Sequence, residues 1–137
     1  MISLLYVSSS VLAAGEEERQ LADIIAVAVP RNLSAGVTGA LVHTGTHFAQ
    51  VLEGERPAVE SIMGSILIDP RHTDVSILDR VPLLRRSFPN WGMVLAKAHP
   101  HTQGFIDMLV ARKNESLTRQ AIAGLVRCLA DSASARI

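Results

Sequence analysis

The stretch VTGALVHTGTHFAQVLEG, residues 37–54, predicts a β-hairpin. Two extended runs, Val37–Thr44 and His47–Glu53, flank Gly45 and are expected to form antiparallel strands around a tight turn. In a strand, successive side chains point to opposite faces. The second strand therefore has one face with large apolar residues, and the other elements of the fold are predicted outward from this pair.

The residues before the hairpin predict a strand and a helix. Ile2–Ser8 is expected to be a strand, with Tyr6 on the same face as its alternate apolar neighbours. Pro30 disfavours helical geometry at Val29, so the following helix is expected to end there. The apolar residues of that helix recur at i, i+3, i+4 and i+7: Leu21, Ile24, Ile25 and Ala28.

The residues after the hairpin predict a second helix, two strands and two final helices. The second helix is expected to begin after Gly54 and to end at Asp69-Pro70. We expect the later elements over Val75–Val81, Asn90–Ala96, Gln103–Arg112 and Ser116–Ala130. In the last strand, alternation places Trp91, Met93 and Leu95 on one face, and the tail from Ser132 is expected to fray.

The predicted order is β-α-β-β-α-β-β followed by two helices. The first six elements match a ferredoxin-like arrangement, in which two helices cover one face of the sheet. We therefore assign the chain to the α+β class, with residues 1–97 as the main domain and residues 98–137 as its C-terminal helical extension.

Composition limits the classes of partner. The chain has 137 residues, enough for one domain, and thirteen Lys plus Arg balance thirteen Asp plus Glu. A neutral chain without a basic stretch gives no reason to expect binding to nucleic acid or to an anionic membrane surface. The N-terminus resembles a signal peptide only faintly, because no Lys or Arg precedes Arg19. The lone Cys128 fits a reducing compartment, so we expect a cytoplasmic protein.

Gln50 is the unusual residue of the hairpin. Alternation puts Phe48, Gln50 and Leu52 on the face that should meet the helices. A buried carboxamide left without partners costs roughly 1–3 kcal/mol for each unsatisfied group, so it needs hydrogen bonds. Tyr6, on the core face of the first strand, can supply one. From spacing alone, a purely structural Gln50–Tyr6 pair remains the simpler interpretation.

Other polar residues allow more than one interpretation. Asn32 could bind a polar ring edge or could simply occupy a turn, and the Asp69, Arg71 and His72 cluster could contact a ligand or cap the second helix. The histidines lack the neighbours of a metal site, so no metal is expected. No nucleophile triad, phosphate loop or dinucleotide fingerprint is present in the sequence, and we expect no enzymatic activity.

Several motifs occur in a fixed order over about residues 2 to 97. They are Leu5-Tyr6-Val7-Ser8, Asn32 with Val37-Thr38-Gly39, Phe48-Ala49-Gln50-Val51-Leu52-Glu53-Gly54, Asp69-Pro70-Arg71-His72, and Arg86-Ser87-Phe88-Pro89-Asn90-Trp91-Gly92-Met93. In order and spacing the chain resembles the BLUF domains, which are flavin-based blue-light sensors.

The resemblance implies a flavin ring lying between the first two helices and the sheet. Asn32 is expected to bond the pyrimidine edge of the ring, and Gln50 to lie between the flavin N5/O4 edge and Tyr6. Either Trp91 or Met93 is expected beside Gln50 on the last strand. The other expected ring neighbours are Ile24, Ala28, Phe48, Leu52 and Ile66 along the apolar walls, with Arg31, Asp69, Arg71 and His72 at the polar edge.

The resemblance also implies a light-driven mechanism without net chemistry. Tyr6 gives up an electron and a proton transiently, Gln50 rotates or tautomerises, and altered hydrogen bonds remain. The change is expected to pass through the last strand to the C-terminal helices and a protein partner. The resemblance makes FAD the expected flavin. Because the chain departs from the family at the pocket rim, FMN and riboflavin are kept as alternatives. The departures are at Ser9, Ala28, Arg31 and Ser65.

Two other functions compete with this one. The chain could be a light-insensitive interaction module that kept the fold and lost the flavin, or a small acylphosphatase-like hydrolase using Arg31 and Asn32. The intact Tyr6–Gln50 pair argues against the first, and the lack of a glycine-rich anion loop argues against the second. The apolar balance and the extra helices lead us to expect a homo-oligomer.

Overall fold

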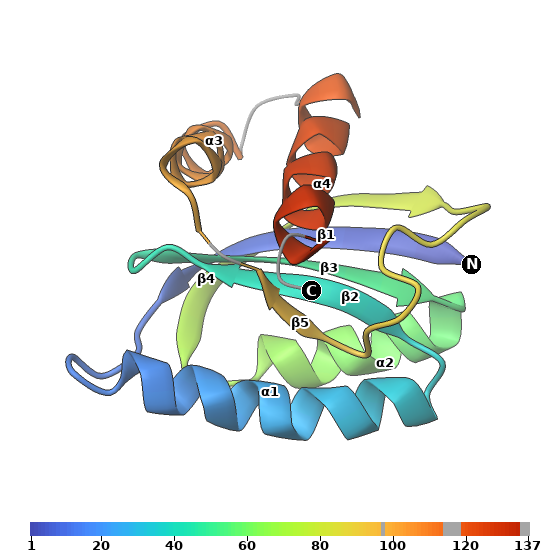
Figure 1. Cartoon of the computed structure of the whole chain (residues 1–137), viewed down its shortest axis with the longest axis horizontal. Coiled ribbons are helices and arrows are strands. Elements are labelled where there is room, and N and C mark those ends of the chain that lie inside the picture. The colour runs from blue at the N-terminus through green and yellow to red at the C-terminus, as the bar shows by residue number, and fades with distance from the viewer. Residues whose placement is uncertain (97, 114–118, 135–137) are drawn as a thin grey trace.

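A mixed β-sheet with helices on both faces makes up the computed structural model, which describes residues 1–96, 98–113 and 119–134 (Figure 1). Strands and helices follow in the predicted order. The elements are β1 (Ile2–Ser10), α1 (Glu17–Ser34), β2 (Thr38–His43), β3 (His47–Gly54), α2 (Arg56–Leu67), β4 (His72–Pro82), β5 (Val94–Ala96), α3 (Pro100–Ala111) and α4 (Arg119–Ser134).

The sheet has the strand order β4-β1-β3-β2-β5. β1 pairs antiparallel with both β3 and β4, β2 pairs antiparallel with β3, and β5 adds to β2 in parallel. In the β1–β3 register Tyr6 lies opposite Gln50, and in the β2–β3 register Leu41 does so from the other side. This confirms the α+β class and the ferredoxin-like order with an added edge strand.

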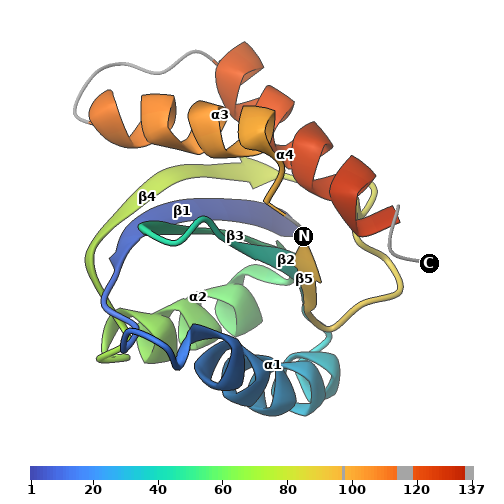
Figure 2. The ribbon, with the colours of Figure 1, turned by 60° about the vertical axis from the view of Figure 1, so that its left-hand side comes forward.

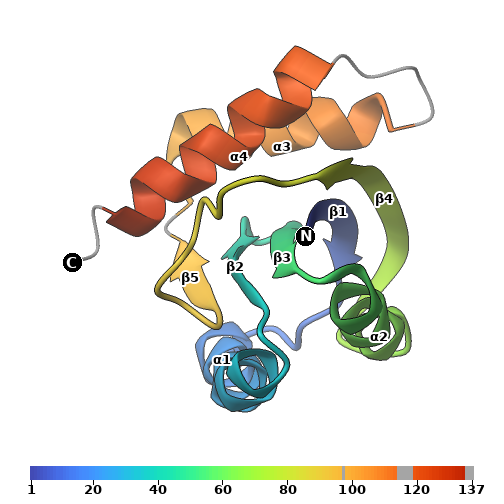
Figure 3. The same ribbon diagram turned by 90° about the vertical axis from the view of Figure 1, so that its right-hand side faces the viewer.

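The two faces of the sheet carry separate cores (Figures 2 and 3). α1 and α2 cover one face, while α3 and α4 cover the opposite face. Leu4, Tyr6 and Leu52 belong to the core on the α1 and α2 side, whereas Leu5 and Phe88 belong to the core on the other side. Because neighbouring strand residues alternate between faces, one strand serves both cores.

The expected end of the first helix at Val29 is wrong, since α1 continues through Pro30 to Ser34. Proline removes one backbone donor from the helix, but the last turn is fixed by tertiary contacts that a local rule does not include. Asn32 in that turn is fully buried and donates to the Gly92 carbonyl. The helix ends where Gly36 adopts a φ of 71°, which glycine allows without strain.

The last strand is shorter than expected, because β5 begins at Val94 rather than Asn90. The Trp91 carbonyl accepts from the Gly39 N–H, and the Gly92 carbonyl accepts from a side chain, so this segment does not continue the regular ladder. Trp91 and Met93 consequently face different cores, and their predicted common face is wrong.

The other helices and strands begin and end within a few residues of their predicted bounds. β4 begins at His72 and α3 at Pro100, both earlier than predicted. α4 reaches Ser134, so the expected fraying from Ser132 is wrong for its first residues, while residues 116–118 and 135–137 lie outside the described part. Among the described residues, no helix is both long and apolar enough to cross a membrane.

Gly39→Ala is expected to lower the free energy of unfolding by about 3 kcal/mol, because the added methyl group cannot fit. Its Cβ would lie 1.9 Å from the Val51 carbonyl oxygen on the paired strand. Gly64→Ala is the control, since nothing lies within 4 Å of a Cβ there in α2. Urea unfolding should show the control to be stabilised by about 0.5–1 kcal/mol. Equal stabilities of the two variants would contradict the tight β2–β3 approach.

Candidate functional site

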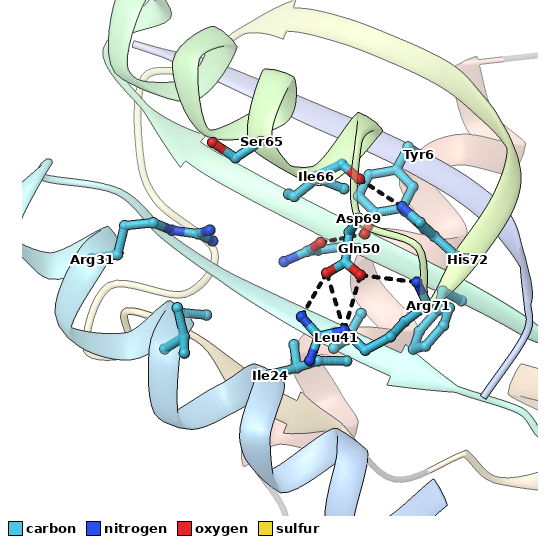
Figure 4. Close-up of a pocket in the computed structure, with 13 residues that line it drawn as sticks. Tyr6, Ile24, Arg31, Leu41, Gln50, Ser65, Ile66, Asp69, Arg71 and His72 are labelled. Atoms are coloured by element: carbon cyan, nitrogen blue, oxygen red, sulfur yellow. Dashed lines mark hydrogen bonds and ion pairs between the residues drawn. The ribbon is translucent and has the colours of Figure 1, made fainter. Parts of the chain in front are cut away.

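A pocket lies between α1, α2 and the sheet (Figure 4). Helix side chains form its sides, and strands β1, β2 and β3 form its floor. The predicted site residues that line it are Tyr6, Ile24, Ala28, Arg31, Phe48, Gln50, Ile66, Asp69, Arg71 and His72. Val27, Leu41 and Ser65 also line it.

Leu52, Asn32, Trp91 and Met93 are the predicted site residues outside this lining. Leu52 is fully buried in the core on the α1 and α2 side. Met93 is buried beside Gln50, whereas Trp91 is half-buried and packs against the core under α3 and α4. Between the two candidates for the neighbour of Gln50, the contact is therefore made by Met93.

Tyr6, Gln50 and Met93 form a short chain of hydrogen bonds at the pocket floor. The Tyr6 hydroxyl donates to Gln50 Oε1 at 2.5 Å, and Gln50 Nε2 donates to the Met93 sulfur at 3.4 Å. Tyr6 and Gln50 are only 3% and 4% exposed. Each half of the amide has a different partner, so any rearrangement of Gln50 must change its bonds to both neighbours.

The environment keeps the Tyr6 phenol protonated. Burial is the main cause and raises the pKa of Tyr6, and the negative charge of Asp69 raises it further. The positive charge of Arg31 lowers the pKa of Tyr6, but by less than burial raises it. Burial also lowers the pKa of Arg31 itself. A neutral phenol that donates a short hydrogen bond can release a proton along that bond when it loses an electron.

Asn32 lies behind the pocket at the C-terminal end of α1. Its Nδ2 donates to the Gly92 carbonyl at 2.9 Å, and its Oδ1 accepts from Arg31 Nε at 3.1 Å. A carboxamide has two N–H donors and an acceptor with two lone pairs. These two bonds use one donor and one lone pair, and the side chain is fully buried outside the pocket lining.

Asp69 and Arg71 form an ion pair at the polar side of the pocket (Figure 4). Arg71 Nη2 donates to Asp69 Oδ2 at 2.6 Å, and the Arg71 backbone N–H donates to Oδ1 at 2.9 Å. The side-chain hydrogen bond from Arg71 is the main cause that lowers the pKa of Asp69, so this carboxylate stays charged.

His72 ties α2 to β1 along the wall of the pocket. The Ile66 carbonyl can only accept, so His72 Nε2, at 2.7 Å from it, carries a proton. In the neutral ring, Nδ1 then accepts from the Ser8 hydroxyl at 2.8 Å. The ring also lies edge-on to Tyr6, with centroids 5.9 Å apart, and so supports the floor residue from the side.

The residues present fit a flat ring with one polar edge. Ile24, Phe48 and Ile66 give apolar walls, while Gln50 and Arg31 offer polar atoms. The cavity has a volume of about 70 Å³. Ligand pockets are usually larger, roughly 300 Å³ or more, so a tricyclic ring requires outward movement of side chains at the mouth.

Pairing and spacing rules point to Leu41 and Val27, two lining residues that were not predicted. Leu41 lies directly opposite Gln50 in the hairpin register, and Val27 follows Ile24 by almost one helical turn. Ser65, expected at the pocket rim, also lines the pocket. Across the part of the chain that the structure describes, no group of three or more His, Cys, Asp or Glu residues could hold a metal ion.

The phenol of Tyr6 is expected to stay neutral in the folded protein beyond about pH 10, where an exposed tyrosine ionises. The pKa of Tyr6 is higher in the folded chain than in the unfolded chain. The stability linked to this shift is therefore fully present below about pH 10 and is lost as the pH rises towards the pKa of the folded state. The chain has one tyrosine, so its ultraviolet absorbance during an alkaline titration reports this group alone. Tyrosinate formation near pH 10 without unfolding would contradict the buried position.

The sequence matches the family BLUF, described as "Sensors of blue-light using FAD", over residues 1–94. It is 39% identical over 77 residues to photoactivated adenylate cyclase subunit beta of Euglena gracilis, covering 56% of this chain and 9% of that protein. It is 33% identical over 103 residues to the blue light- and temperature-regulated antirepressor BluF of Escherichia coli (strain K12), covering 74% of this chain and 25% of that protein. The chain therefore spans a quarter or less of these relatives.

Solved structures show the same fold over nearly the whole chain. BlrB, a BLUF protein solved in its dark state, is 30% identical with a TM-score of 0.75, and the match covers 96% of both chains. BlsA in its photo-activated state is 26% identical with a TM-score of 0.80, and the match covers 94% of both chains. The chain belongs to the BLUF family of flavin-based blue-light sensors.

Proposed function

We propose that the light switch of this sensor is the chain of hydrogen bonds from Tyr6 through Gln50 to Met93. The observation that carries this proposal is the 2.5 Å bond from the Tyr6 hydroxyl to Gln50 Oε1, continued by the 3.4 Å contact of Gln50 Nε2 with the Met93 sulfur. Both contacts lie in the buried floor of the pocket, where water does not compete for the partners.

FAD is the proposed flavin, because the family is described by it. Ile24, Phe48 and Ile66 would hold the ring, and Asn32, which lies fully buried behind the pocket, would meet its pyrimidine edge once neighbouring side chains move aside. FMN and riboflavin share that ring, and a related solved structure is titled as containing FMN. Extraction of the bound flavin followed by chromatography distinguishes the three.

A bound flavin supplies absorption of blue light and an excited state that accepts an electron. Tyr6 provides this electron, and its proton leaves along the existing bond to Gln50 Oε1. Rotation or tautomerisation of the Gln50 carboxamide then exchanges its donor and acceptor atoms. The electron and the proton return to Tyr6, so there is no net oxidation or reduction; rotation of Gln50 changes no covalent bond, whereas tautomerisation replaces one of its N–H bonds by an O–H bond. The altered hydrogen bonds of Gln50 persist and change its contact with Met93.

The output is proposed to leave through β5 and the C-terminal helices, residues 98–137, which act with the main domain of residues 1–97. Met93 directly precedes β5, and α4 packs against β5. We propose a sensor without enzymatic activity, located in the cytoplasm, that acts as a homo-oligomer on a protein partner. Two longer relatives, a photoactivated adenylate cyclase subunit and a blue light-regulated antirepressor, support an output that depends on light.

The purified protein is expected to be yellow, and blue light should shift its flavin absorption slightly to the red, reversibly in the dark. Gln50→Leu and Tyr6→Phe should keep the flavin but lose the reversible shift, because each removes one partner of the 2.5 Å bond. Ser65→Ala, at the rim of the same pocket, is a control that should retain the shift. A colourless protein that refuses added flavin would contradict the function, and a reversible shift in Gln50→Leu would contradict the switch.

Met93→Leu is expected to change the rate of dark recovery about tenfold, since it removes the sulfur that accepts from Gln50 while keeping the volume similar. A tenfold rate change corresponds to about 1.4 kcal/mol in the barrier, which is the size of one hydrogen bond. Trp91→Phe is the matched control, because Trp91 packs against the other core. A larger effect of the tryptophan variant on the recovery rate would contradict this assignment.

A further inference from the structure

Glu53 is a carboxylate with no exposed surface at the end of β3, the strand that carries Gln50. Its Oε2 accepts from the Ser87 N–H at 2.8 Å, and its Oε1 accepts from the Phe88 N–H at 2.9 Å. A buried charge is costly unless it is hydrogen-bonded, so these two amides are tied firmly to the carboxylate. Gln50 and Glu53 are three residues apart and therefore face opposite sides of the sheet.

Arg86 binds the same region from the surface. Its guanidinium donates to the Thr38 hydroxyl at 2.8 Å, to the Glu53 backbone carbonyl at 2.9 Å and to the Gly36 carbonyl at 2.8 Å. Phe88, two residues after Arg86, is fully buried in the core under α3 and α4. The Glu53 carboxylate and the Arg86 guanidinium thus hold residues 86–88 against the ends of β2 and β3.

Residues 83–93, here called the β4–β5 connector, carry Met93 at their end. The segment crosses from β4 at one edge of the sheet to β5 at the other (Figure 3). Before Met93, the Gly39 N–H donates to the Trp91 carbonyl and Asn32 donates to the Gly92 carbonyl. Gly92 fits closely against α1, because a Cβ there would lie 2.7 Å from the Val29 carbonyl oxygen.

Met93 therefore lies between a segment that is bonded to the Glu53 carboxylate and a three-residue edge strand. Upstream, Glu53 binds two consecutive amides of the connector with charge-assisted hydrogen bonds. Downstream, β5 has three residues and pairs in parallel with β2 at the sheet edge, before α3 begins at Pro100. A displacement of Met93 meets more resistance from the upstream side than from the short edge strand.

We propose that Glu53 is a positioning residue of the photoswitch, which fixes the connector so that movement of Met93 passes forward into β5 and α3. Without this anchor, the connector would rely on the bonds at Trp91 and Gly92, so part of the same rearrangement of Gln50 would be taken up by displacement of residues 87–93, and less of it would reach the helices. The inference rests on the proposed switch at Gln50, but it concerns transmission of the signal and not its photochemistry.

Hydrogen exchange of the flavin-loaded full chain, measured in the dark and under blue light, tests the role of Glu53. Glu53→Gln keeps the shape but replaces one acceptor oxygen by an NH₂ group, which would face a backbone N–H and lose that bond. Glu55→Gln is the matched control, because its side chain lies two residues away and is 77% exposed. Flavin absorption is recorded on the same samples.

In the wild type, light should change exchange in residues 94–96 and 100–111. In Glu53→Gln the reversible red shift should remain, while this light-dependent difference should fall at least threefold and a new difference should arise in residues 87–93. The Glu55→Gln control should behave as the wild type. A purely structural role would alter exchange equally in light and dark and would leave the light-minus-dark difference unchanged.

The inference would be overturned if the light-minus-dark exchange difference at β5 and α3 were unchanged in Glu53→Gln. It would also be overturned if the wild type showed the red shift but no exchange difference at β5 and α3. Loss of the red shift in a variant that still binds flavin would also overturn it, because Glu53 would then act on the photochemistry. If Glu53→Gln does not bind flavin, Glu53→Asp replaces it, because a side chain shorter by one methylene withdraws the carboxylate from the Ser87 and Phe88 amides; normal transmission in that variant overturns the inference. A wild type without any red shift counts against the proposed function instead.

Discussion

The antiparallel register of β1 and β3 is the constraint on which the rest of the site depends. It sets Tyr6 opposite Gln50, and the 2.5 Å hydrogen bond follows from that pairing. A slip by one residue would turn every side chain of a strand to the other face. The apolar cores on the two faces prevent such a slip, so the packing that stabilises the sheet also fixes the geometry of the switch.

The sheet separates the proposed light switch from the proposed output helices. The pocket and the Tyr6–Gln50 pair face α1 and α2, whereas α3 and α4 cover the other face. Met93 belongs to the pocket-side core but directly precedes the edge strand that leads to α3. A local change of hydrogen bonding at Gln50 thus has a short covalent path to the far side, and the buried Glu53 carboxylate accepts two hydrogen bonds from the segment that leads to Met93.

Strand alternation was sufficient to predict which side chains of β1 and β3 face the core on the α1 and α2 side. It placed Phe48, Gln50 and Leu52 together and Tyr6 on the core face, since these positions depend only on the period of two. The rule that a proline ends the preceding helix was wrong at Pro30, because contacts made by Asn32 to a distant segment maintain the helix. Strand alternation was wrong at Trp91, which lies before β5 and faces the other core. It also gave no sign of the bonds that the Ser87 and Phe88 amides donate to Glu53. Those bonds join irregular backbone more than thirty residues away, which no periodic pattern encodes.

The most direct test of the switch is the light-minus-dark infrared difference spectrum of protein carrying isotope-labelled tyrosine. Because the chain contains a single tyrosine, every band that moves with the label belongs to Tyr6. A reversible change of Gln50 must alter the hydrogen bond that the Tyr6 hydroxyl donates, so the account predicts label-sensitive bands in the difference spectrum. A light-induced red shift accompanied by a difference spectrum that the tyrosine label leaves unchanged would contradict it.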